Sequence, residues 1–127
     1  MASIHVEATV DLPADELWAR VSDAGNVSVL LDVVTESSLD GDIRSCTLAD
    51  GRALTERIIA VDHDHRRVAY TVVEGMPVEY HAASMQVLDA GDGRATLRWI
   101  TDVAPDEAAE RLGPLFEAEM EGLAARL

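Results

Sequence analysis

The order of the predicted elements constrains the fold of this chain more than any other feature of its sequence. An alternating strand over residues 3–10 is followed by a short amphipathic helix, about six strand-like runs with tight turns, and a long amphipathic helix after Pro105. An antiparallel sheet of these strands has an apolar face that only the last helix is long enough to cover. We therefore predict an α+β fold, in which a curved antiparallel sheet of about seven strands wraps around the C-terminal helix and leaves a cavity.

The first strand and the first helix have clear sequence signals. Apolar residues alternate with polar ones from Ile4 to Val10, which is the period of a half-buried strand. Pro13 suits the first turn of a helix, the acidic residues that follow it suit the positive end of the helix dipole, and Gly25 ends the helix. A second short helical turn is expected over residues 27–31.

Turn signals divide the next segment into strands. From Val33 the apolar residues recur with a period of two, as in an antiparallel meander. The turns are expected at Asp40-Gly41, Asp50-Gly51, residues 62–66, residues 75–77 and residues 90–93.

The last segment carries one apolar helical stripe. Its members recur at three- and four-residue intervals and are Leu112, Leu115, Phe116, Met120, Leu123 and Leu127. Pro114 lacks an amide hydrogen and crowds the carbonyl four residues earlier, so we expect a kink at Gly113-Pro114.

The hairpin at Asp50-Gly51 allows the facing of single residues to be predicted. A two-residue turn there would place Arg44 opposite Arg57, and two opposed guanidinium groups belong on a solvated face. The cavity face would then carry Ile43, Ser45, Thr47, Leu54, Glu56 and Ile58. A carboxylate is therefore expected inside an apolar cavity.

The last hairpin leaves two alternatives open. An even-numbered loop around Gly91-Asp92 would place Tyr80, Ser84 and Gln86 on the same face as Trp99. A bulge or an odd-numbered loop would reverse this facing and bring His81 inside in place of Tyr80. On the strand before it, Tyr70 belongs to the bulkier face and is expected inside.

Charge and composition exclude several classes of function. The chain has 24 acidic and 10 basic residues, a formal net charge of −14, and every basic residue is Arg. Such a field repels phosphate backbones and anionic lipids, so we expect neither a nucleic-acid partner nor membrane insertion. Without Lys, Schiff-base catalysis by a lysine amine is excluded. Because Cys46 is the only cysteine and no signal-peptide pattern is present, a cytoplasmic location is expected.

The order and spacing of several short segments resemble the START-like, or SRPBCC (Bet v1-like), superfamily, in particular its polyketide cyclase/dehydrase and lipid-transport-like branch. The segments are Val6–Val10 leading into Pro13–Trp18, Leu48–Gly51, Thr55–Ile58, Arg66–Tyr70, Met76–Val78 and Ala95–Trp99. The resemblance spans nearly the whole chain and implies a helix-grip fold in a single domain, residues 1–127. This superfamily includes both enzymes and ligand carriers, so the fold alone does not supply the function.

Glu56 is the candidate catalytic residue. A carboxyl group in an apolar cavity can serve as a general acid or base, although it can also be held by a neighbouring hydroxyl or Arg. The predicted ligand contacts are Trp18, Leu54, Ile58, Tyr70, Tyr80, Ser84, Gln86, Trp99, Phe116 and Met120. The two tyrosines are assigned to orient ligand oxygens, and Trp99 and Phe116 to form apolar walls.

No metal site or cofactor is expected. His63-Asp64-His65 has the residue types of a metal site, but it falls in a predicted turn and lacks a third and a fourth ligand.

Three functional hypotheses remain. The chain binds a small hydrophobic molecule as a polyketide cyclase/dehydratase-like enzyme, which the resemblance favours, or holds a lipid or metabolite as a carrier or sensor, or acts as an interaction module. A monomer or a homodimer is compatible with these.

Overall fold

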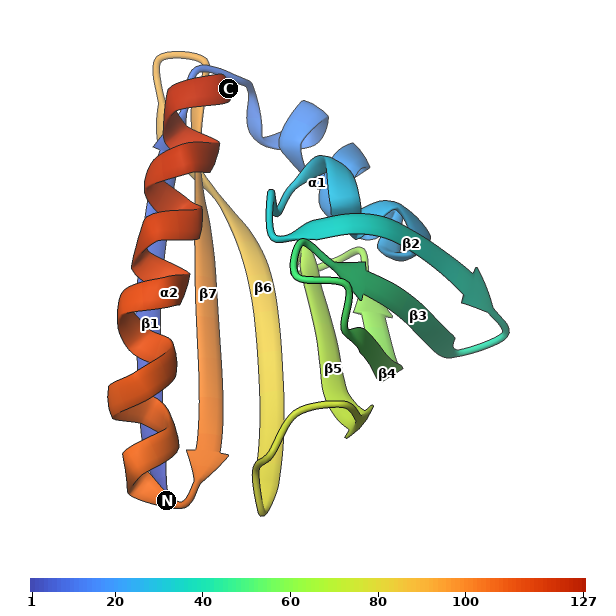
Figure 1. Cartoon of the computed structure of the whole chain (residues 1–127). Coiled ribbons are helices and arrows are strands. Elements are labelled where there is room, and N and C mark those ends of the chain that lie inside the picture. Colours follow the sequence, from blue (N-terminus) through green and yellow to red (C-terminus); the bar gives the residue numbers. More distant parts are fainter.

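All strands of the chain join one seven-stranded antiparallel sheet in the computed structural model, which describes residues 1–127 (Figure 1). The strands are β1 (Ala2–Val10), β2 (Val34–Asp40), β3 (Ile43–Leu48), β4 (Ala53–Asp62), β5 (Arg67–Glu74), β6 (Tyr80–Gly91) and β7 (Arg94–Ala104). Their order in the sheet is β1-β7-β6-β5-β4-β3-β2. The sheet is therefore a meander whose far edge is completed by the first strand.

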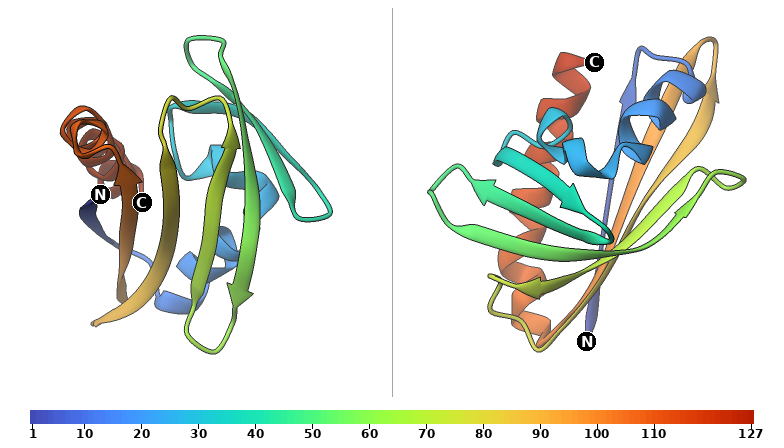
Figure 2. Two further views of the ribbon diagram at one scale, coloured as in Figure 1. Left: turned by 90° about the horizontal axis from the view of Figure 1, so that it is seen from below. Right: turned by 90° about the vertical axis from the view of Figure 1, so that its right-hand side faces the viewer.

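Two helical segments follow β1, and one long helix closes the fold. They are α1 (Ala14–Ser22), the 3-10 helix η1 (Ala24–Val29) and α2 (Asp106–Arg126). The helix α2 packs on β1 and β7, at one end of the sheet. In Figure 2 the sheet curves so that β2, β3 and β4 cross obliquely to α2. The predicted α+β helix-grip fold is thus confirmed.

The core lies between α2, α1 and the concave face of the sheet. It is one cluster of 27 buried apolar residues. Leu17 of α1, Leu97 of β7 and Leu123 of α2 are fully buried. Burial of one such side chain contributes about 1.5–3 kcal/mol, so these leucines fix both helices to the sheet.

The helix α2 continues through Gly113-Pro114, where the sequence predicted a kink. Pro114 cannot donate to the carbonyl of Glu110, but both residues are exposed, so water can satisfy that carbonyl. Leu112 is buried before this point, and Met120 is buried after it. The apolar stripe therefore packs on both sides of the proline.

The predicted facing of β3 is wrong, whereas that of Leu54 and Glu56 on β4 is confirmed. Arg44 pairs with Glu56 rather than with Arg57. The loop has three residues, not two, because the amide of Leu48 bonds to the carbonyl of Arg52, and Gly51 has a left-handed φ of 88°. This extra loop residue shifts the register by one and turns Arg44 and Cys46 inward.

On β6 the structure takes the second of the two alternatives, so the inward facing that the ligand contacts Tyr80, Ser84 and Gln86 required is wrong. A bulge between Asp89 and Gly91 shifts the register with β7, so that Met85 lies opposite Trp99. As a result His81 is buried and Tyr80 is 49% exposed. This is the alternative that a bulge was expected to produce.

Candidate functional site

A cavity of about 440 Å³ lies between α2 and the strands β2, β3 and β4. Nineteen residues line it, and 13 of them are hydrophobic. The apolar share suits a small organic molecule, and the volume lies within the usual range of ligand pockets. Its walls come from η1 and the loop after it, from every strand except β1, from the β3–β4 and β5–β6 loops and from the middle of α2.

Five of the predicted site residues line this cavity. They are Leu54, Glu56, Tyr70, Trp99 and Phe116. Ligand contact at each of them stays a prediction. Six others lie outside the cavity lining, namely Trp18, Ile58, Tyr80, Ser84, Gln86 and Met120.

These six residues have other positions in the fold. Trp18 is buried in α1 and donates its indole N–H to Nδ1 of His63 at 3.2 Å. Gln86 donates to the carbonyl of His65, and Tyr80 and Ser84 share its face of β6, opposite to that of His81. Ile58 packs at the edge of the core, and Met120 is buried beneath a shallow groove between α2 and β1.

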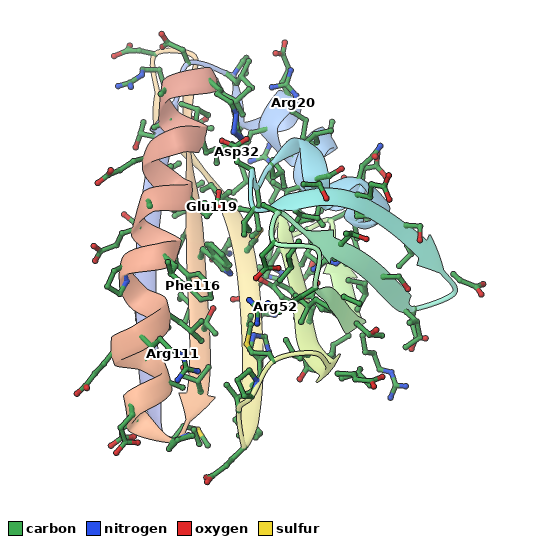
Figure 3. The ribbon with its side chains drawn as sticks, in the orientation of Figure 1. Arg20, Asp32, Arg52, Arg111, Phe116 and Glu119 are labelled. Atoms are coloured by element: carbon green, nitrogen blue, oxygen red, sulfur yellow. The ribbon has the colours of Figure 1, made fainter.

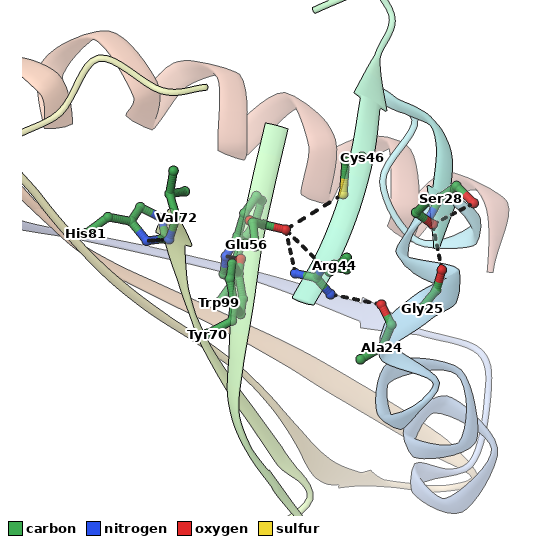
Figure 4. Close-up of polar contacts among 11 residues, drawn as sticks. Ala24, Gly25, Ser28, Arg44, Cys46, Glu56, Tyr70, Val72, His81 and Trp99 are labelled. Atoms are coloured by element: carbon green, nitrogen blue, oxygen red, sulfur yellow. Dashed lines mark hydrogen bonds and ion pairs between the residues drawn. The ribbon is translucent and has the colours of Figure 1, made fainter. Parts of the chain in front are cut away.

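A buried ion pair forms the polar centre of the cavity (Figure 4). Nε and Nη2 of Arg44 lie 2.9 and 2.8 Å from Oε1 of Glu56, and the two side chains are only 5% and 8% exposed. Nη1 of Arg44 donates to the carbonyl of Ala24 in η1 at 3.1 Å. Arg44 therefore links the sheet to η1 while it neutralises Glu56.

All hydrogen bonds to the Glu56 carboxylate use Oε1. Besides Arg44, the thiol of Cys46 donates to that atom at 3.8 Å. Oε2 has no hydrogen-bond partner in the protein. Every buried side-chain nitrogen and oxygen of this chain has such a partner, so Oε2 is not a buried atom. Oε2 is therefore open to the cavity, where it can accept a hydrogen bond from a ligand.

An aromatic group forms the wall beside this ion pair. The guanidinium carbon of Arg44 lies 4.8 Å from the ring centroid of Tyr70, and the indole of Trp99 donates to the Tyr70 hydroxyl at 2.8 Å. The rings of Trp99 and Phe116 stack with centroids 4.2 Å apart. Burial, followed by the charge of Glu56, raises the pKa of Tyr70, so its hydroxyl stays protonated and its hydrogen is free to donate.

His81 supplies a second donor to the cavity. Its Nδ1 accepts the amide hydrogen of Val72 at 3.1 Å, so the ring proton of the neutral form is on Nε2. Nε2 has no protein partner and is therefore open to the cavity that His81 lines. Burial lowers the pKa of His81 to about 4, which keeps the ring neutral near pH 7.

Cys46 lacks the features of an activated nucleophile. Burial, and next the charge of Glu56, raise the pKa of its thiol to about 11. The thiolate form is therefore rare near pH 7.

The mouth of the cavity lies between α2 and the segments before β2 and β4. Val33 and Leu115 are exposed apolar residues at this mouth. Figure 3 shows Phe116 and Glu119 on the side of α2 that faces β2 and β3, with Arg52 across the gap. Arg52 pairs with Asp50 at 2.7 Å.

Glu119 holds one side of this mouth in place. Its two carboxylate oxygens accept the amide hydrogens of Asp32 and Val33, at 3.1 and 2.8 Å. At the end of the same helix, Arg126 pairs with Asp32 and donates to the carbonyl of Leu30. The second half of α2 is thus tied to the loop between η1 and β2.

The chain has no cluster of three or more His, Cys, Asp or Glu side chains that could hold a metal ion. His63 accepts the indole hydrogen of Trp18, and His65 bonds to Asp62. These contacts give both histidines of the His63-Asp64-His65 segment a structural role.

Sequence reasoning did not place Arg44, His81, Arg52 and Glu119 in the site. For His81 the signal was present in the alternative register of the last hairpin. Glu119 follows Leu115 and Phe116 at helical spacing, so the stripe could have indicated it. The inward facing of Arg44 depends on the length of the loop before β4, and the turn residues Asp50-Gly51 do not determine that length.

No helix in this structure combines the length and the apolar character that crossing a bilayer requires.

Comparisons with known proteins agree with this architecture. MLP-like protein 423 of Arabidopsis thaliana is 26% identical over 111 residues, which cover 76% of this chain and 72% of that protein. The structure of XoxI from Bacillus cereus superimposes with a TM-score of 0.91 at 17% identity, over 99% of this chain and 95% of XoxI.

An enzyme also shares the fold. Norcoclaurine synthase from Thalictrum flavum, solved in complex with dopamine and hydroxybenzaldehyde, superimposes with a TM-score of 0.72 at 23% identity, over 98% of this chain and 84% of that one. The family model described as "Polyketide cyclase / dehydrase and lipid transport" matches residues 1–127. Together with the helix-grip fold and its cavity, this match shows that the chain belongs to the polyketide cyclase/dehydrase and lipid-transport family of START-like (Bet v1-like) proteins.

Proposed function

We propose that this protein binds a small, largely apolar molecule in the cavity between α2 and the sheet, and that residues 1–127 act as one ligand-binding domain. The observation that carries the proposal is the lining of the cavity. Its walls are mostly apolar, yet Oε2 of Glu56 and Nε2–H of His81 face inward without a protein partner, and the hydroxyl of the lining residue Tyr70 accepts from Trp99 but donates to no protein group. A ligand with a few oxygen atoms would match this pattern.

The first candidate activity is cyclisation or dehydration of a polyketide-like substrate. Glu56 pairs with Arg44 through Oε1, which leaves Oε2 to remove a proton from the carbon next to a carbonyl group. The Tyr70 hydroxyl can donate a hydrogen bond to that carbonyl oxygen, where negative charge develops. The family description and the presence of a synthase among the structures that share the fold support this candidate.

The second candidate is a carrier or sensor that holds a lipid or metabolite unchanged. The family description names lipid transport, and the Arg44–Glu56 ion pair suits a polar anchor as well as a catalytic group. In this case Glu56 would orient the ligand and nothing would be converted. A cytoplasmic location and a monomeric or homodimeric state remain predictions under both candidates.

Native mass spectrometry after exposure to a cell extract tests the proposal. We expect the protein to retain a compound of defined mass, and retention to be lost when Phe116→Trp fills part of the cavity. A compound found unchanged in the extract supports the carrier, whereas one lighter than an extract component by one water supports the enzyme. Retention of no compound would contradict ligand binding.

The variant Glu56→Gln separates the two candidates. Loss of conversion with binding retained would indicate acid/base chemistry, because glutamine keeps the shape of the side chain but cannot exchange a proton. Loss of ligand binding, in a protein that converts nothing, would indicate that Glu56 only anchors the ligand. Glu36→Gln, on the exposed surface of β2, is the matched control and should change neither property.

A further inference from the structure

The charged groups that line the cavity sum to a negative value. Two of them are cationic, Arg44 and Arg52, and three are acidic, Asp32, Glu56 and Glu119, which leaves one net negative charge. His81 is neutral, since its Nδ1 accepts a backbone hydrogen and its pKa is lowered. The lining as a whole therefore offers no excess positive charge to a ligand.

Each cation of the lining also has a carboxylate partner. Arg44 bonds to Oε1 of Glu56 through two nitrogens and uses a third for the carbonyl of Ala24. Its guanidinium faces the Tyr70 ring, as Figure 4 shows. Arg52, at the mouth, is paired with Asp50. An incoming anion would have to displace one of these carboxylates.

We propose that the Arg44–Glu56 pair sets the charge specificity of the cavity, which takes an uncharged ligand and excludes the carboxylate of the same shape. This inference rests on the proposed ligand-binding function. It names Glu56 as the group that cancels the charge of Arg44, in addition to its proposed role towards the ligand.

The physical reason is the cost of burying an anion. A carboxylate that enters the cavity loses its hydration, and only an available cation could offset that loss. Here the deepest cation is already neutralised, and Oε2 of Glu56 would repel the anion. An amide or ketone avoids both penalties, because its oxygen can accept from Tyr70 or His81 and an amide or hydroxyl hydrogen can be donated to Oε2.

The wild-type protein provides the first test. Isothermal titration calorimetry at pH 7 compares 2-naphthamide with 2-naphthoate, which have nearly the same shape and differ in charge. We expect the amide to bind at least about tenfold more tightly, the difference that one hydrogen bond to a charged group commonly makes. Equal or tighter binding of naphthoate would overturn the inference, whether the anion sits at Arg44 or at Arg52.

The variant Glu56→Gln provides the second test. It leaves the Arg44 charge uncancelled, so the affinity for naphthoate should rise about tenfold, whereas naphthamide should gain no affinity because it loses its hydrogen bond to a charged oxygen at this position. The double variant Arg44→Gln/Glu56→Gln has neither charge and should lose this gain. Circular dichroism establishes that each variant is folded. The comparison of the two probes on the wild-type protein does not depend on the folding of the variants.

The outcomes separate this inference from the proposed function. If the amide binds and the naphthoate binds equally well, or if Glu56→Gln is folded and gains no affinity for naphthoate, the charge specificity is refuted while ligand binding stands. If neither probe binds to the wild-type protein, both the inference and the proposed site are contradicted for aromatic ligands of this size.

Discussion

Replacing Arg44 by methionine should strongly destabilise the protein. The change removes both contacts to Oε1 of Glu56, at 2.9 and 2.8 Å, and the hydrogen bond to the carbonyl of Ala24, at 3.1 Å. The Glu56 side chain is only 8% exposed, so its charge would remain buried without a partner. Removal of one member of such a pair costs about 3–5 kcal/mol, which is a large part of the roughly 5–15 kcal/mol that stabilises an ordinary domain.

The effect should depend on pH in a defined direction. In Arg44→Met the buried carboxyl can avoid the cost by taking up a proton, and it does so more readily in the folded variant than in the unfolded chain. The folded state then binds more protons, so the variant loses stability as the pH rises. The difference from the wild type should therefore shrink when the pH is lowered from about 7 to about 5.

Urea unfolding monitored by tryptophan fluorescence and circular dichroism measures this loss. The control is Arg44→Met/Glu56→Leu, in which both charges are replaced by apolar side chains of similar size. We expect the double variant to recover most of the lost stability, because apolar replacement of a buried pair is often neutral. A single variant that loses less than about 1 kcal/mol at pH 7, or a double variant no more stable than the single one, would refute the reasoning.

Three further predictions concern other residues. The pKa of His81 falls from 6.5 to about 4 on folding, so the unfolded state binds more protons between these pH values. The free energy of unfolding should therefore decline as the pH falls from 6.5 towards 4. Urea unfolding at several pH values should show a smaller decline for His81→Asn. Cys46 should react with iodoacetamide at pH 8 far more slowly in the folded protein than in urea, and fast labelling of the folded protein would argue against a raised thiol pKa. Pro114→Ala should raise the free energy of unfolding by about 1–3 kcal/mol because it restores a helix hydrogen bond at an exposed position, and an unchanged melting temperature would contradict this.

The fold was predictable because its signals are local and repeated. The alternation from Ile4 to Val10 and the stripe through Leu112, Met120 and Leu123 each place several residues on one face, so a single error does not change the result. The inward facing of Leu54 and Glu56 on β4 follows instead from a solvated position for Arg57, and it holds because Arg57 is exposed even though Arg44 is buried.

The site was less predictable because it depends on two single-residue features. One extra residue in the loop that contains Gly51 brings Arg44 to face Glu56, and one bulge near Gly91 exchanges Tyr80 for His81. Both are decided by backbone geometry and packing across the whole sheet rather than by the turn residues alone. The neighbourhood of Glu56, and hence its pairing with Arg44, could not follow from its spacing in the sequence.

The pairing of β1 with β7 has a consequence for folding during synthesis. Ile4 lies opposite Thr101 and Val10 opposite Ala95, so β1 has no sheet partner until about ninety further residues have been synthesised on the ribosome. Contacts of such long sequence separation form late. Leu112, Phe116 and Glu119, which close the cavity, are translated later still. The cavity can therefore receive its ligand only after synthesis of α2, and the nascent β1 must be kept from pairing with other chains until then.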